Sequence, residues 1–110
     1  MMRAYELMVI LDSDLEDARA QAYVKVVTDG IVAAGGTIHG RPDWWGKRAF
    51  AYPIDRKDTG YYLVIEAVAP AGSLAELERT LRIADEVVRF KLLKLPVAEA
   101  ARRGMAVDAA

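Results

Sequence analysis

Positively charged side chains stand beside aromatic ones at two places in this sequence, a combination that suits nucleic-acid binding. In the stretch WWGKRAFAYPI, Lys47 and Arg48 follow two tryptophans. In the stretch VVRFKLLKL, Arg89 and Lys91 alternate with apolar residues. Because phosphates attract the positive charges and bases stack on the rings, both stretches could contact RNA. Each cation taken alone is equally compatible with a solvated face.

The residue types that usually carry catalysis form no recognisable site. The absence of cysteine excludes disulfides, thiolate nucleophiles and cysteine metal sites. His39 is the single histidine, and no phosphate-binding glycine motif or H-E-x-x-H motif occurs. An acidic cluster lacks the glycine and ligand spacing of a calcium loop, and helix capping explains its members, Asp12, Asp14, Glu16 and Asp17. We therefore predict a protein with no enzymatic activity, no metal and no cofactor.

The composition predicts one small soluble domain. The chain has 110 residues and a formal net charge of −1, which is enough chain for one hydrophobic core. No apolar run approaches the roughly 18 residues that a membrane span needs. The opening MMRAYELMVILDSD also lacks the cleavage site of an export signal. We expect a cytoplasmic protein in which any nucleic-acid site is a local patch rather than the whole surface.

The elements that must position the charged residues follow from hydrophobic periodicity. Apolar and β-branched runs predict strands at residues 5–11, 37–40, 61–68 and 87–95, with KRAFAYPI as an extended connection. Apolar residues at three- and four-residue steps predict two helices. Ser13 with Glu16, and Ser73 with Glu76, have the spacing of a capping box at the start of each helix. The pair Gly35-Gly36 ends the first helix.

This order of elements predicts an α+β fold, the ferredoxin-like βαββαβ sandwich, in which two helices cover one face of a four-stranded antiparallel sheet. We assign residues 1–96 to this domain. Residues 97–110, VAEAARRGMAVDAA, have no clear partner in the fold. Their composition predicts a flexible C-terminal tail.

The sheet face without helices is predicted to be open to a partner. Successive strand residues point to opposite faces, so the face opposite Tyr5, Leu7, Val9 and Leu11 should carry alternate residues of three strands. Those residues are Glu6, Met8, Ile10, Tyr62, Val64, Glu66, Arg89, Lys91 and Leu93. This mixture is more apolar than a monomer normally exposes, and it brings cations beside an aromatic ring. We expect a partner to bind there.

The two tryptophans cannot both enter one core if they lie on a regular strand. Adjacent strand residues point to opposite sides, so either Trp44 or Trp45 should be partly exposed. A loop that folds both rings over the sheet edge is the alternative.

Three segments together resemble a known family, that of bacterial small-subunit ribosomal protein six. The opening MRAYELMVIL, the segment WGKRAFAYPI followed by GYYLVIEA, and the segment LERTLRIADEVVRFKLLKL are similar to the family's pattern, in order, over about residues 2 to 95. In one place the pattern differs, because GRPDWWG carries an extra residue and a proline. Pro42 indicates a bulge or an edge strand there.

The resemblance implies a structural constituent of the small ribosomal subunit in the cytoplasm. It implies binding to the central domain of small-subunit (16S) rRNA together with small-subunit protein eighteen, during assembly of the platform, with no catalytic site and no cofactor. The RNA-binding candidates carried over by position are Arg3, Tyr5, Lys47, Arg48, Arg89 and Lys91. The candidates for contact with the partner protein are Trp44, Trp45, Met8 and Tyr62.

A second function remains open from the residues alone. Ferredoxin-like sheets also associate through open faces or edges, so the chain could be a small-molecule-binding or regulatory homodimer.

Overall fold

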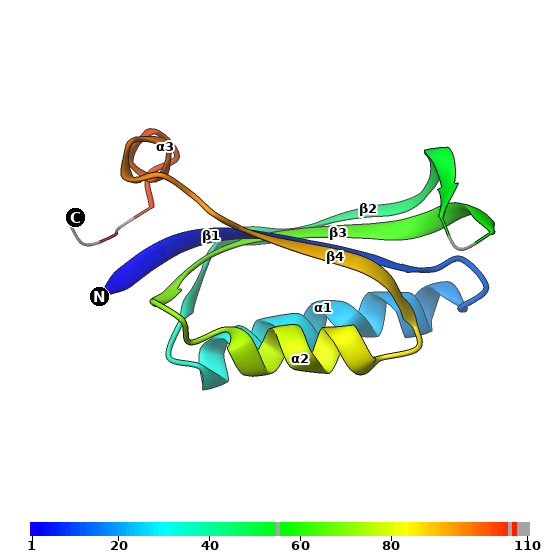
Figure 1. Ribbon diagram of the computed structural model, residues 1–110, viewed down its shortest axis with the longest axis horizontal. Coiled ribbons are helices and arrows are strands. Elements are labelled where there is room, and N and C mark those ends of the chain that lie inside the picture. The colour runs from blue at the N-terminus through cyan, green and yellow to red at the C-terminus, as the bar shows by residue number, and fades with distance from the viewer. Residues whose placement is uncertain (55, 106, 108–110) are drawn as a thin grey trace.

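The computed structural model describes residues 1–54, 56–105 and 107. These residues form β1 (Met2–Asp12), α1 (Asp17–Ala33), β2 (Thr37–Ile54), β3 (Lys57–Pro70), α2 (Ala75–Ile83), β4 (Val87–Lys94) and α3 (Val97–Arg102). The strands make one antiparallel sheet in the order β2-β3-β1-β4, and α1 and α2 lie together on one face of it (Figure 1). The predicted ferredoxin-like arrangement is confirmed.

The core lies between the sheet and the two long helices. Alternate residues of β1 point into it, and Val9 and Leu11 are both 0% exposed. The helices bury their own stripes against these strands, and the principal members from the other elements are Val27, Ile31, Leu63, Ile65 and Leu81. Each such side chain contributes about 1.5–3 kcal/mol on leaving water. The predicted core positions of the first strand are confirmed.

The strand register confirms which residues share the face away from α1 and α2. Met8 pairs with Val64 on one side and with Lys91 on the other, and Ile10 pairs with Tyr62 and Arg89. Residues that pair directly across antiparallel strands point to the same face. The predicted open-face set therefore lies on one surface, which we call the open face.

Ile10 is the exception on the open face, because it is only 3% exposed. The chain approaches closely at Gly60, where an added Cβ would lie 2.7 Å from Ile10 Cγ2 and 2.8 Å from Phe50 Cζ. The ring of Phe50 therefore covers Ile10. Any residue larger than glycine at position 60 would force these two side chains apart.

Strand β2 continues to Ile54, well beyond the predicted residues 37–40, and its pairing with β3 shifts register at three places, the last of them between Ala49 and Ile54. His39 pairs with Glu66 and Asp43 pairs with Val64, so four steps along β2 match two along β3. A second shift falls between Trp44 and Gly46. Gly46 has φ +76°, a backbone conformation that glycine adopts without strain and that is typical of a bulge. The irregularity predicted around Pro42 is thus a bulge within the strand.

The helix starts differ from the predicted capping boxes. Helix α1 begins at Asp17, and its N-cap Glu16 makes no side-chain cap hydrogen bond. The Ser73 hydroxyl has no hydrogen-bond partner among the described residues, and Leu74 is the N-cap of α2. Acidic residues in the first turn of each helix still interact favourably with the helix dipole. The predicted end of α1 is confirmed, since the Gly36 N–H donates to the Ile31 carbonyl at 2.9 Å.

The segment after β4 has a partner in the fold, which corrects the expectation that it has none. Helix α3 lies on the opposite side of the sheet from α1 and α2 (Figure 1). Ala100 is 0% exposed and Met105 is 4% exposed, in a small cluster with Ala4, Val68 and Leu95. Small side chains on both surfaces allow this close contact. The division into a domain of residues 1–96 and a flexible tail of residues 97–110 stays a prediction about motion.

A hydrogen-bonded group ties α1 to the start of β4. The Glu86 carboxylate accepts hydrogen bonds from Arg19, at 2.7 and 2.9 Å, and from the Tyr23 hydroxyl at 2.7 Å. Burial, and then the hydrogen bond to Glu86, raise the pKa of Tyr23 to about 12. The hydrogen bonds from Arg19 and Tyr23 hold the pKa of Glu86 below its usual value.

We expect Tyr23 to make the protein sensitive to alkaline pH. An unfolded tyrosine loses its proton near pH 10 and the folded one near pH 12, so this contribution is complete below pH 10 and is lost as the pH rises to 12. Since the hydroxyl is only partly buried, we expect a loss of about 1–2 kcal/mol. Denaturant unfolding of the wild type and Tyr23→Phe between pH 9 and 11.5 measures it. Equal losses in the two proteins would contradict the prediction.

No helix in the described part of the chain is long and apolar enough to cross a membrane.

Candidate nucleic-acid interface

Aromatic rings form a stacked group on the open face. The Trp45 ring lies 5.6 Å from the Tyr62 ring with an interplanar angle of 12°, and the Phe50 ring meets Tyr62 edge-on at 6.0 Å. Trp45 Nε1 donates to Asp43 at 2.8 Å, which fixes the indole. The bulge at Gly46 turns Trp45 toward this face, where it is 41% exposed. The group presents aromatic surface to a partner.

Three cations share the open face with these rings. The Arg48 guanidinium is 5.7 Å from the centre of the Trp45 ring. Arg89 and Lys91 project from β4 opposite Ile10 and Met8. All three cations are exposed, and within the described ranges none of them forms an ion pair. Their charges are therefore available to phosphates.

A hollow of about 280 Å³ adjoins the aromatic group. It lies between the sheet and the hairpin that joins β2 to β3, and it is lined by Phe50, Ala51, Tyr52, Pro53, Ile54, Tyr62 and Arg89. Among the described residues, the lining combines aromatic rings with one positive charge and includes no carboxylate. Such a hollow suits an unstacked base with its phosphate beside it.

The structure separates the predicted site residues into two groups. Six lie together on the open face, namely Met8, Trp45, Arg48, Tyr62, Arg89 and Lys91. Four lie on the other face or at its edge, namely Arg3, Tyr5, Trp44 and Lys47. Neighbouring residues divide in this way because strand side chains alternate.

Most side chains of the second group pack against other parts of the protein. Tyr5 is 8% exposed within the core, so its ring has little surface to offer RNA. Trp44 stacks on Tyr61 at 5.7 Å and 22°, and Lys47 Nζ lies 5.2 Å from the centre of the same Tyr61 ring. Arg3 Nε is inaccessible and has no hydrogen-bond partner among the described residues. The predicted division of the tryptophans is confirmed, with Trp45 the exposed ring.

The residues considered for metal or acid-base chemistry have structural partners. Lys57 Nζ lies 2.6 Å from Asp14 and 3.4 Å from Asp12, and this contact lowers the pKa of the Asp14 carboxyl. His39 Nε2 lies 2.9 Å from the Arg103 carbonyl oxygen. Both observations support the structural interpretation of these side chains.

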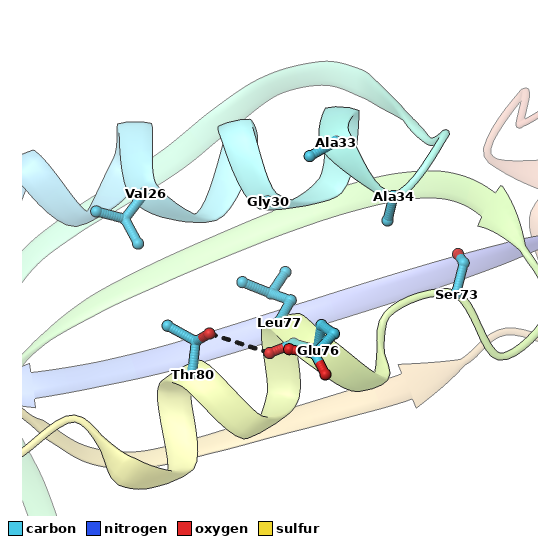
Figure 2. A pocket seen from close by; sticks show the side chains of 8 residues that line it. All are labelled: Val26, Gly30, Ala33, Ala34, Ser73, Glu76, Leu77 and Thr80. Atoms are coloured by element: carbon cyan, nitrogen blue, oxygen red, sulfur yellow. Dashed lines mark hydrogen bonds between the residues drawn. The ribbon is translucent and has the colours of Figure 1, made fainter.

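A separate cleft of about 330 Å³ lies between α1 and α2. Figure 2 shows Leu77 pointing from α2 toward Gly30 on α1, where an added Cβ would lie only 2.8 Å from Leu77 Cδ1. Thr80 uses its hydroxyl to donate to the Glu76 carbonyl at 3.0 Å. The cleft is lined by Val26, Gly30, Ala33, Ala34, Ser73, Glu76, Leu77 and Thr80. Its described lining includes neither a cation nor an aromatic ring, so it is unlike a nucleic-acid site.

Two parts of the interface were missed in the sequence. Phe50 shares a face with Arg48 because it lies two residues further along the strand. The extended run KRAFAYPI predicts that Phe50 enters the sheet, but not that it joins the aromatic group. The hollow beside it depends on how the hairpin bends over the sheet, which no local pattern indicates. The adjacency of Gly46 to the tryptophan pair was the available signal for the bulge that exposes Trp45.

Known proteins resemble this chain over most of its length. The family model described as Ribosomal protein S6 matches residues 4–94. Small ribosomal subunit protein bS6 of Salinispora arenicola is 43% identical over 93 residues, which cover 84% of this chain and 96% of that protein. The corresponding protein of Hyphomonas neptunium is 34% identical over 94 residues, covering 86% and 83%. The crystal structure of 30S ribosomal protein S6 from Thermotoga maritima superposes with a TM-score of 0.85 at 28% identity, covering 94% of this chain and 97% of that one.

Proposed function

Because the chain belongs to the ribosomal protein S6 family, we propose that it binds the central domain of small-subunit (16S) rRNA through its open face, together with small-subunit protein eighteen. Membership makes the chain a structural protein of the small subunit of the cytoplasmic ribosome, from a family that is not one of enzymes. Family membership also favours the ribosomal function over the alternative of a regulatory homodimer.

One observation carries the proposal of the open face as the RNA site. Arg48, Arg89 and Lys91 are exposed without ion-pair partners in the described residues, and they share the open face with the stacked rings of Trp45 and Tyr62. Arg48 lies against Trp45, and the two cations of β4 lie across β1 from Tyr62. Phosphate contacts then position the RNA, and the rings supply stacking for unpaired bases. Lys47, on the edge strand β2, and Arg3, near the start of the inner strand β1, lie on the other face and remain candidates for further phosphate contacts.

The partner protein is proposed to use the apolar part of the same region. Met8 and Tyr62 lie diagonally across β1 and β3, where Met8 pairs with Val64, and Leu93 on β4 is 40% exposed. Apolar surface of this kind, rimmed by charges, is typical of a protein contact. Trp45 would then lie where the protein and RNA contacts meet.

A binding experiment tests this function. The affinity for a central-domain rRNA fragment is measured between 50 and 300 mM salt, with and without protein eighteen. We expect weak, salt-sensitive binding by the chain alone and an increase of at least about tenfold with the partner, as positive coupling requires. Equal affinity for an unrelated RNA of the same length, or no effect of the partner, would contradict the proposal.

A further inference from the structure

Two carboxylates sit directly opposite each other on the open face. Glu6 of β1 pairs with Glu66 of β3, and both side chains are 30% exposed. Like charges in direct cross-strand positions repel each other. They would also repel the phosphates of an RNA bound to the same face.

Arg103, just beyond α3, is inserted between these two carboxylates. Its Nη1 lies 2.7 Å from Glu66 Oε2 and 3.2 Å from Glu6 Oε1, and its Nε lies 2.6 Å from Glu99 Oε2. The hydrogen bonds to Glu99 and then to Glu66 raise the pKa of Arg103 further above its usual value. No other cation of the described residues pairs with Glu6 or Glu66.

The position of Arg103 is set by packing rather than by the ion pairs alone. Ala100 and Met105, on either side of it, are buried against Ala4, Val68 and Leu95. The Arg103 carbonyl is also 2.9 Å from His39 Nε2 on β2. The guanidinium is therefore held over the sheet, on the side where Figure 1 shows α3.

The carboxylates are close enough to affect the proposed RNA site. Glu6 is two residues from Met8, the cross-strand partner of Lys91, which corresponds to about 7 Å along a strand. With about 5 Å more across to β4, the backbone positions of Glu6 and Lys91 are roughly 8–9 Å apart, which is comparable to the Debye length of about 8–10 Å at ordinary salt. A hollow of about 420 Å³ runs between Arg103 and Trp45, and Glu6, Glu66, Arg41, Asp43 and Val64 complete its lining.

We infer that Arg103 is a positioning residue for RNA binding, which acts by offsetting part of the negative charge of Glu6 and Glu66 on the open face. This inference rests on the proposed function. Arg103 lies outside residues 4–94, the part that matches the family model. Arg41 lines the same hollow but forms no ion pair with a described residue, so it does not replace Arg103.

Four full-length proteins test the inference: the wild type, Arg103→Ala, Arg102→Ala, and Arg103→Ala combined with Glu6→Gln and Glu66→Gln. Arg102 is the matched control, because it pairs with Glu99 but not with the sheet carboxylates and its side chain is 77% exposed. We expect Arg103→Ala to weaken binding to the central-domain rRNA fragment about tenfold at 50 mM salt, with a smaller difference at 300 mM. Arg102→Ala and the triple variant should bind within about twofold of the wild type.

Rescue by the two glutamines separates charge neutralisation from other roles. If Arg103 contacts RNA itself, or only holds the C-terminal segment in place, the triple variant will bind as poorly as Arg103→Ala, and the inference is overturned. Wild-type affinity in Arg103→Ala would overturn it as well. Melting temperatures of all four proteins identify any loss due to unfolding.

A second probe keeps this test separate from the rRNA assignment. On immobilised heparin, Arg102→Ala should elute at higher salt than Arg103→Ala, although the two proteins have the same net charge. If the wild type fails to bind the rRNA fragment, the proposed function fails, while the heparin order still decides whether Arg103 neutralises this face. Identical elution of the two variants would overturn the inference.

Discussion

Replacing Arg89 and Lys91 together with alanine is expected to weaken binding to the central-domain rRNA fragment by about 30- to 100-fold near 0.1 M salt. Each of the two cations is expected to contact one phosphate. At an exposed surface screened by salt, such a contact contributes about 1–1.5 kcal/mol, at or below the lower limit for hydrogen bonds to charged groups. The slope of log K against log salt should become less steep by about 1.4–1.8, because two fewer counterions are released. Affinity measurements at four or more salt concentrations give both quantities.

The fold should tolerate this change. Arg89 and Lys91 are exposed and take part in no ion pair with a described residue, and surface substitutions of this kind usually alter stability by less than about 0.5 kcal/mol. The matched control removes two charges from the helical layer, Arg79→Ala with Arg82→Ala. If that control loses as much affinity as the β4 variant, the RNA is bound through overall charge and not at the open face.

The sheet could be predicted well because its information is local. In β1, β3 and β4 the side chains alternate between faces, so one correct assignment of Tyr5 to the core fixes the direction of every other residue on that strand. The pairing of Met8 with Lys91 and Val64 then follows from the antiparallel order. Residues that share the open face were therefore found from strand phase alone.

The C-terminal segment could not be predicted in the same way, because its contacts are distant in sequence. Arg103 reaches Glu6, 97 residues away, and Glu66, 37 residues away. A six-residue helix has little stability of its own, so its formation depends on the surface that Ala100 packs against. The sequence indicates a charged, alanine-rich extension, and strand phase places Glu6 and Glu66 on the open face. Nothing in the local pattern indicates that these two carboxylates bind Arg103.

The bulges in β2 lie near residues whose types indicate them, namely Pro42 and Gly46. Gly46 after a tryptophan pair indicated a break in alternation, and Pro42 indicated another. Alternation alone puts Lys47 and Arg48 on different faces, but without the exact register neither of them could be assigned to a particular face. The structure makes this assignment, since Lys47 pairs with Tyr61 and Arg48 with Gly60.

The two tryptophans should respond to truncation in opposite ways. Trp44→Ala is expected to lower the free energy of unfolding by about 2–3 kcal/mol, because its partly buried ring packs on Tyr61 and the core. For a domain of this size such a loss lowers the melting temperature by about 10–20 °C. Trp45→Ala should cost about 1 kcal/mol or less, the contribution of its stack on Tyr62.

RNA binding should show the reverse order, because Trp45 is the ring that faces a partner. Loss of one base–aromatic stack weakens binding by about tenfold, so Trp45→Ala should bind the rRNA fragment about ten times more weakly than the wild type. Trp44→Ala, measured well below its melting temperature, should bind within about threefold of it. Thermal unfolding and RNA titration of the same two preparations give the comparison. If Trp44→Ala loses affinity while still folded and Trp45→Ala does not, the RNA site lies on the helix-covered side of β2, and the proposed use of the open face is wrong.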